Sequence, residues 1–191
     1  MPEIVQQPAR VLRQVALEVP VKSISTPKIK KILKEMSKAL AEQDDGVAIA
    51  APQIGYSLRI FVVSGKVFNN DFIENRAARR RGETKEIIKV EKTPDRVFIN
   101  PVLSKLSRER EWMPEGCLSV RWLYGKVHRS KKAFAEAYDE NGKKFKLGAS
   151  GLLAQIFQHE TDHLNGILFH DFAKDLREEL PEIKTQIKAE K

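Results

Sequence analysis

The chain has 191 residues, of which 41% are hydrophobic and 31% charged, a balance typical of a soluble globular protein. The length predicts a single domain over residues 1–191 with a sizeable buried core. No apolar run approaches the roughly 20 residues that a membrane-spanning helix needs, and the N-terminus lacks the layout of a signal peptide. We therefore expect a cytoplasmic protein with no membrane contact.

The formal net charge is +8, and an excess of basic residues favours polyanionic partners at long range. The densest basic cluster, Arg79-Arg80-Arg81, has acidic residues around it and no aromatic residues within it. We interpret it first as a solvated loop and second as a nucleic-acid contact, and we expect no recognition of a specific nucleic-acid sequence. A weak association with the ribosome through a basic surface is a further hypothesis.

The first predicted helix begins at Thr26 and Pro27, because threonine is a common N-cap residue and proline a common first helical residue. Apolar residues at helical spacing follow, and the helix is expected to end near Asp44-Asp45-Gly46.

Two short β-branched and aromatic runs, at residues 59–63 and 96–100, predict strands, and Pro101 is expected to end the second. Residues 64–95 between them are highly charged and too numerous for a tight turn. We expect a long solvated segment there, with one further short strand at 86–90.

In the second half of the chain, residues 133–138 and 143–147 predict a β-hairpin around Asn141 and Gly142. A long apolar helix is expected from about residue 150 to 165.

The end of the chain, residues 173–189, is highly charged and predicts a C-terminal helix interrupted at Pro181. Together these elements predict an α+β fold, in which short antiparallel β-sheets pack around the central helix at 150–165.

The most informative stretch is His159-Glu160-Thr161-Asp162-His163 in this central helix. Residues four apart lie on one face of a helix, so the two imidazoles can bind one metal ion while Glu160 lies beside it. This pattern indicates hydrolysis at a metal centre. The alternative is that both histidines are ordinary hydrogen-bonded residues.

A catalytic site of this kind needs a third protein ligand, and several residues are candidates. The favoured one is Cys117, the only cysteine, which follows Gly116 in a short motif. The alternative for this thiol is a small buried apolar residue. A histidine three residues beyond Gly166 would define another class of metal site, but that position is Phe169, and His170 is out of register. Downstream carboxylates are the remaining candidates: Glu178, Glu179 and Glu182.

A third segment, residues 46–55, is built from small and apolar residues apart from Gln53. Small residues allow close approach of another backbone, and a buried glutamine side chain needs polar partners. A substrate carbonyl is one such partner, although a tightly packed corner of the fold explains the small residues equally well.

The segment 46–55, the Glu115-Gly116-Cys117-Leu118-Ser119 motif and the His-Glu-x-Asp-His motif, in this order, resemble the three signature motifs of the peptide deformylase family. Members of that family hydrolyse the formyl group from the N-terminal formylmethionine of newly made polypeptides and release formate. The resemblance implies metal ligands Cys117, His159 and His163, with Glu160 as general acid and base. It also implies that Gln53 and the Leu118 amide stabilise the oxyanion, and that Fe²⁺ is the native metal, with Zn²⁺, Ni²⁺ or Co²⁺ able to take its place.

The methionine side chain needs an apolar pocket, for which Val47, Leu152 and Ile156 are the candidates. We expect the substrate backbone to add as a strand between residues 46–48 and Gly116. The candidate substrate-binding residues are therefore Gly46, Val47, Ala48, Gly116, Leu152 and Ile156.

Three features depart from the usual family pattern. Ala48 stands where the family has glycine, residues 121–124 replace a Pro-Gly sequence, and the charged stretch 65–95 is long. Arg129 is expected to pair with Glu115 or Asp162 and so to support the site. The competing hypotheses are a different metallopeptidase, with a third ligand after His163, and a catalytically silent binding protein.

Overall fold

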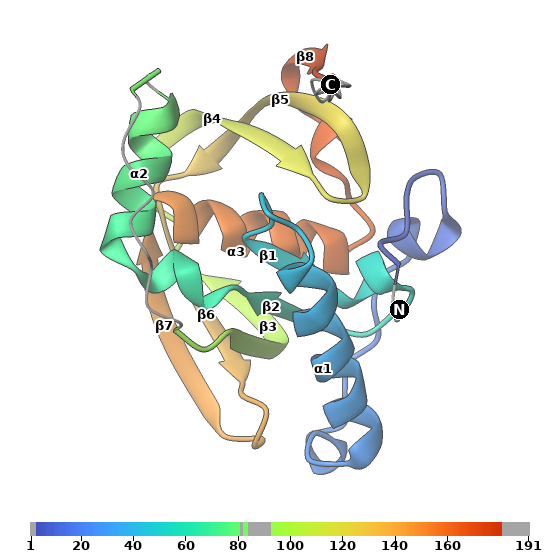
Figure 1. Ribbon diagram of the computed structural model, residues 1–191. Helices are drawn as coiled ribbons and strands as arrows, with labels where there is room; N and C mark the ends of the chain where they lie inside the picture. The colour runs from blue at the N-terminus through green and yellow to red at the C-terminus, as the bar shows by residue number, and fades with distance from the viewer. Residues whose placement is uncertain (1–2, 81, 84–92, 181–191) are drawn as a thin grey trace, which may run out of the picture.

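The computed structural model describes residues 3–80, 82–83 and 93–180, and their strands form two antiparallel sheets. The five-stranded sheet has the order β1-β2-β3-β6-β7, and the three-stranded sheet has the order β4-β5-β8. Three α-helices, α1, α2 and α3, accompany them (Figure 1). The bounds are β1 Ala48–Ala50, β2 Ile60–Val63, β3 Arg96–Ser104, β4 Arg110–Cys117, β5 Val120–Ser130, β6 Lys132–Tyr138, β7 Lys144–Ser150, β8 Lys174–Glu178, α1 Pro27–Ala41, α2 Asn70–Arg80 and α3 Gly151–Leu164.

Both faces of the five-stranded sheet are covered, one by α1 and the other by α3. Successive side chains of a strand point to opposite faces, and β2 shows the consequence. Its Ile60 and Val62 lie in the cluster formed with α1, whereas Phe61 and Val63 lie in the cluster that contains α3. All four are buried completely. The continuous apolar run in the sequence therefore marks a strand with a core on each side.

Helix α3 is held on the sheet by a group of aromatic rings. Phe157 of α3 packs edge-on against Phe98 of β3, with ring centroids 5.2 Å apart, and Phe98 stacks on Phe61 of β2 at 4.6 Å. Such ring pairs add to the hydrophobic stabilisation and restrict orientation. They place the opposite face of α3 beneath the three-stranded sheet, and Figure 1 shows the helix between the two sheets.

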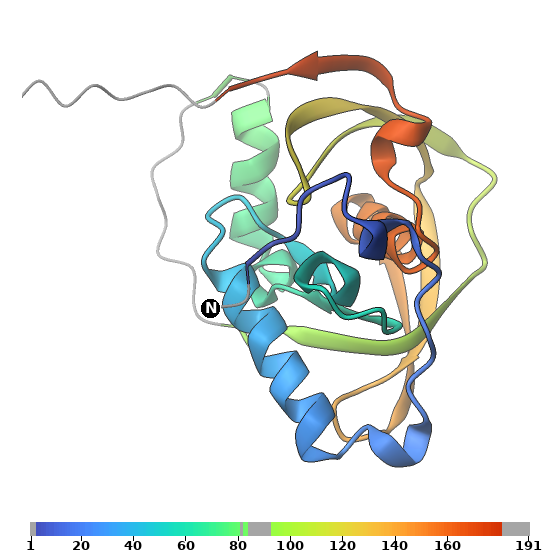
Figure 2. The ribbon, with the colours of Figure 1, turned by 90° about the vertical axis from the view of Figure 1, so that its right-hand side faces the viewer.

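The three-stranded sheet turns one face toward α3. Along β4, Met113 and Glu115 are buried, whereas Trp112 and Pro114 are exposed. Strand β8 pairs with the outer edge of β5, and Figure 2 shows it beside the β4–β5 hairpin. A glutamate inside the sheet needs charged or polar partners, and the site described below supplies them.

These observations confirm the α+β class and most of the predicted elements. The first helix begins at Pro27, the β6–β7 hairpin turns at residues 139–143, and α3 ends just before Gly166, whose φ is 72°. Within the described residues, no helix is long and apolar enough to cross a membrane.

Two predictions about local structure were wrong between β2 and β6. Pro101 does not end β3, because the register between Ile99 and Val102 shifts at an irregularity where the missing N–H of proline is tolerated. The charged stretch is not simply a loop, since residues 70–80 form α2. The predicted strand at 86–90 lies outside the described residues.

The predicted C-terminal helix was also wrong in its first part. Residues 174–178 form β8, although their composition suits a helix. Pairing with the free edge of β5 supplies backbone hydrogen bonds that a charged, isolated helix would have to form alone, and this tertiary context outweighs the local preference. The rest of that prediction, from Pro181 onward, lies outside the described residues.

Candidate active site

Three potential metal ligands meet where α3 passes under the end of β4. The sulfur of Cys117 and one ring nitrogen each of His159 and His163 all lie within 4.8 Å of one another. The Sγ of Cys117 is 3.2 Å from Nε2 of His163. Of the histidine, cysteine and acidic side chains in the described residues, these three are close enough to share one ion. One sulfur and two imidazole nitrogens, with no fourth ligand from the described part of the chain, form a donor set that fits a catalytic divalent metal.

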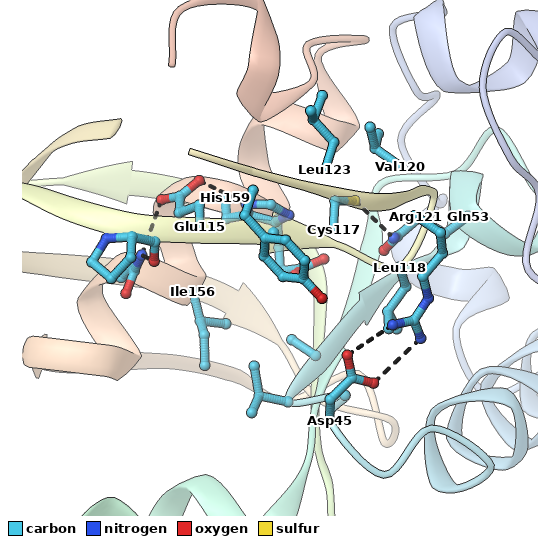
Figure 3. A pocket seen from close by; sticks show the side chains of 18 of the residues that line it. Asp45, Gln53, Glu115, Cys117, Leu118, Val120, Arg121, Leu123, Ile156 and His159 are labelled. Carbon is cyan, nitrogen blue, oxygen red and sulfur yellow. Dashed lines mark hydrogen bonds and ion pairs between the residues drawn. The ribbon is translucent and has the colours of Figure 1, made fainter. Parts of the chain in front are cut away.

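A buried ionic network orients His159. Its Nδ1 lies 3.0 Å from Glu115 Oε2, which leaves Nε2 to face the other donors (Figure 3). Nε and Nη2 of Arg129 donate to both carboxylate oxygens of Glu115 at 2.8 and 3.0 Å. Nη1 of Arg129 donates to Asp162 at 2.6 Å, so the expected pairing with Glu115 or Asp162 is confirmed for both. Burial opposes the charge of Glu115, but the bonds from His159 and Arg129 outweigh it and lower its pKa to about 2.

Glu160 lies beside the proposed ligands and is 4% exposed. Its Oε2 has no hydrogen-bond partner within the described residues, although it is buried. Burial raises the pKa of Glu160 to about 7. A carboxyl group with this pKa can accept and release a proton near neutral pH, which is the property a general acid and base needs.

The amide of Gln53 is fixed with its donor end toward the same place. The Ala50 N–H donates to Gln53 Oε1 at 2.8 Å, which orients the side chain. Its Nε2 then donates to Ser119 Oγ at 3.2 Å and lies 3.5 Å from the sulfur of Cys117. Gln53 is 2% exposed and Leu118 is 8% exposed, and both line the cavity next to this sulfur.

The candidate substrate residues line one cavity of about 250 Å³. Residues 46–48 lie on one side of it, Gly116 and the start of β5 on another, and the apolar side chains of α3 on a third. Cys117, His159 and Glu160 also line it, whereas His163 is only 1% exposed and lies behind them. The structure therefore brings together the predicted lining residues Gly46, Val47, Ala48, Gly116, Leu152 and Ile156.

The other candidates for a third ligand lie elsewhere. The position at which another class of metal site has a histidine is Phe169, whose buried ring stacks on that of His159 with centroids 6.3 Å apart. His170 contacts Arg13 and Asp171. Glu178 and Glu179 are exposed in and after β8, and Glu182 lies outside the described residues.

The sequence reasoning missed several residues of the cavity. Asp45, Arg121 and Tyr124 line it, and Ser119 is a partner of Gln53. Residues 121–124 stood out only as an unfamiliar stretch, and nothing in the sequence connects Arg121 with Asp45. The structure explains why residue 116 is a glycine, because a Cβ there would lie 2.6 Å from ring carbons of Tyr124.

The fold and the site together fit a metal-dependent hydrolase of the α+β class, with a cavity of about 250 Å³ beside a Cys-His-His donor set and a buried glutamate. The model of the polypeptide deformylase family matches residues 1–179. The chain belongs to this family, whose members remove the formyl group from N-terminal formylmethionine.

Three similar proteins illustrate the range of the family. Peptide deformylase 1A, chloroplastic, of Solanum lycopersicum is 37% identical over 90% of this chain, which spans 59% of that relative's length. Peptide deformylase of Psychrobacter cryohalolentis is 34% identical over 92% of this chain and 80% of its own length. The crystal structure of an Acinetobacter baumannii peptide deformylase bound to Met-Ala-Ser has a TM-score of 0.70 and 26% identity, covering 88% of this chain and 97% of that one.

Proposed function

We propose that this chain hydrolyses the formyl group from the N-terminal formylmethionine of newly made polypeptides and releases formate. The position of Glu160 is the observation that carries the proposal. Its buried carboxylate lines the same cavity as Cys117 and His159, with one oxygen unpartnered among the described residues. A buried acceptor with no partner in the fold is placed to act on water and substrate.

We propose Cys117, His159 and His163 as the ligands of one divalent metal ion, with Fe²⁺ as the native ion. The mixed sulfur and nitrogen donors support a first-row transition metal, and Zn²⁺, Ni²⁺ and Co²⁺ are the alternatives that metal analysis would distinguish. When bound, such an ion lowers the pKa of water toward about 7 and polarises a carbonyl oxygen.

In the proposed reaction, the oxygen of water bonds to the formyl carbon, and the bond between that carbon and the methionine nitrogen breaks. Glu160 accepts a proton from the water and donates it to the departing nitrogen. The pKa of about 7 that burial gives Glu160 supports both roles in turn.

The developing negative charge on the formyl oxygen needs hydrogen-bond donors, and we propose Gln53 Nε2 and the Leu118 N–H. Gln53 is suited to this role because its Oε1 is already bound to the Ala50 N–H, so the donor end is held in place before substrate arrives. Preorganised donors of this kind are worth about 10²–10³ in rate each.

For the substrate, we propose that the methionine side chain lies against Val47, Leu152 and Ile156, and that its backbone runs between residues 46–48 and Gly116. All of these residues line the cavity beside Glu160. A relative with a similar fold holds the peptide Met-Ala-Ser, which supports a peptide as the occupant. A cramped space at the metal would admit formyl and exclude acetyl.

The decisive experiment measures formate release from formyl-Met-Ala-Ser together with metal content. Glu160→Ala should retain the metal, because this residue is not a proposed ligand, and should lose turnover by about 10²–10⁴. The matched control is Glu140→Ala, which removes an exposed glutamate from a turn. Undiminished formate release by Glu160→Ala would overturn the proposed mechanism.

We also propose that the reaction takes place in the cytoplasm and that a basic surface gives weak association with ribosomes, where the substrates emerge. The net charge of +8 supports the association with ribosomes. The tomato relative, in contrast, is named as a chloroplastic protein. Cell fractionation tests the first proposal. For the second, co-sedimentation with ribosomes should weaken as salt is raised, and its absence at low salt would end the idea.

A further inference from the structure

Two walls of the cavity come from segments that are far apart in the sequence. One is the segment that leads into β1, at residues 45–48, and the other is the start of β5, at residues 120–124. The second wall is supported from behind, because the N–H of Glu179, just after β8, donates to the Trp122 carbonyl at 3.0 Å. A peptide that pairs with residues 46–48 therefore depends on how these two segments are held relative to each other.

The side chain of Arg121 connects the two walls. Nη1 and Nη2 of Arg121 lie 2.8 and 3.3 Å from the two carboxylate oxygens of Asp45 (Figure 3). Nη2 also donates to Gln43 Oε1 at 2.8 Å. The guanidinium thus makes a two-pronged contact with one residue of the opposite wall and a further bond to Gln43, just after α1. This geometry fixes orientation as well as distance.

Both ends of this contact are held in place by their own segments. The Arg121 guanidinium lies 4.9 Å from the centre of the Trp122 ring, and its backbone N–H donates to Gln6 at 3.4 Å. On the other side, the Gly46 N–H donates to the Gln43 carbonyl at 3.0 Å and closes the turn that contains Asp45. The arginine therefore reaches a preformed acceptor.

We infer that Arg121 and Asp45 are positioning residues that hold the two walls of the peptide groove at the separation an extended substrate needs. This inference rests on the proposed function and specifies how that site binds peptide. The contact lies at the rim, with side chains 21% and 56% exposed, so it orders the groove without taking part in the chemistry. Holding a groove in its binding conformation improves affinity because less order has to be imposed on binding.

The expected effect is therefore on KM and depends on the length of the substrate. Arg121→Ala should raise KM for formyl-Met-Ala-Ser about fivefold, the limit for an exposed ion pair, while kcat changes less than about twofold. The KM of formylmethionine amide should rise less, since this compound has almost no backbone to place between the walls. The KM of formyl-Met-Ala-Ser divided by that of formylmethionine amide, called the KM ratio below, therefore measures the positioning effect.

Asp45→Ala and the double variant test whether the two residues act as one unit. Both single variants break the contact between Arg121 and Asp45, and Arg121→Ala also removes the bond to Gln43, so the double variant should raise the KM ratio no more than Arg121→Ala alone. Raising salt should raise the ratio for the wild type but not for the variants, because salt screens exposed charges. The control is Lys126→Ala, which removes another exposed ion pair of β5, to Asp175 at 2.9 Å, outside the cavity lining.

The outcomes separate this inference from the proposed function. A wild type that releases no formate overturns the proposed function. A wild type that releases formate, with variants that leave the KM ratio unchanged, overturns only the positioning role. A lower KM ratio in Arg121→Ala also overturns it, since the contact would then obstruct the groove. If Arg121→Ala fails to fold, Asp45→Ala and the salt dependence of the wild type decide the question.

Discussion

Strand β5 carries two arginines that join it to carboxylates on other elements, and they differ most in their contact with water. The side chains of Arg129 and its partner Glu115 are 7% and 3% exposed, whereas those of Arg121 and Asp45 are 21% and 56% exposed. A buried charge depends entirely on its partners, but an exposed one is also stabilised by solvent. The floor of the site, meaning the buried residues Gln53, Glu115 and Arg129, is therefore part of the folded core. The rim, meaning Arg121 and Asp45, is held by a contact that can change without unfolding the protein.

Removing the buried arginine should have the largest effect. Arg129→Ala removes the guanidinium that bonds to both Glu115 and Asp162, and breaking a buried pair in this way costs about 3–5 kcal/mol of stability. Urea unfolding, followed by circular dichroism, measures this loss. Lys126→Ala serves as the control on the same strand and should change the free energy of unfolding by less than about 1 kcal/mol. A similar small loss for both variants would show that the buried network is not what stabilises the floor.

Gln53→Ala tests whether a buried side chain of the site contributes directly to catalysis. Removing its amide should lower kcat by about 10²–10³, because a donor to the developing oxyanion is lost. Formate release at saturating substrate measures the effect, and metal content confirms that the ligands are intact. Ser119→Ala removes only the oxygen that accepts from Gln53, and should therefore cost much less than Gln53→Ala. Equal losses would mean that Gln53 acts by supporting the fold.

Glu115→Gln tests the hydrogen bond that orients His159 and should have a smaller effect. The substitution keeps the shape of the side chain but weakens the acceptor for His159 Nδ1, and changes next to a metal ligand typically cost about 10–100-fold in metal affinity. Competition with a chelator measures the affinity. Glu111→Gln changes an exposed glutamate of the same strand and should leave the affinity unchanged. An unchanged affinity in Glu115→Gln would remove this residue from the support of the site.

The parts of the site that follow local rules could be predicted from the sequence. His159 and His163 are four residues apart on a strongly apolar helix, so their convergence follows from helix geometry. The Asn141-Gly142 turn and the helix start at Pro27 are equally local signals. The role of Cys117 as a third ligand was harder to predict, because its approach to the histidines depends on how β4 crosses α3. The resemblance to a family supplied that prediction, which local rules could not.

The remaining features depend on contacts between distant segments. Strand β8 forms because β5 offers a free edge, and Pro101 is accepted in β3 because the strand has an irregularity there. The contact of Arg121 with Asp45 joins residues 76 positions apart, neither of which carries a distinctive pattern. Local composition contains no information about which partner a surface arginine will find.

The smallest expected effect belongs to Arg121, the more exposed of the two arginines. Arg121→Ala should lower the free energy of unfolding by about 1 kcal/mol or less, because solvent replaces much of what the contact with Asp45 provides. Combining it with Arg129→Ala should give a loss close to the sum of the single losses, since the two arginines share no partner. Urea unfolding of the four proteins in parallel measures both points. A loss above about 2 kcal/mol for Arg121→Ala alone, or strong coupling to Arg129→Ala, would mean that rim and floor form one cooperative unit.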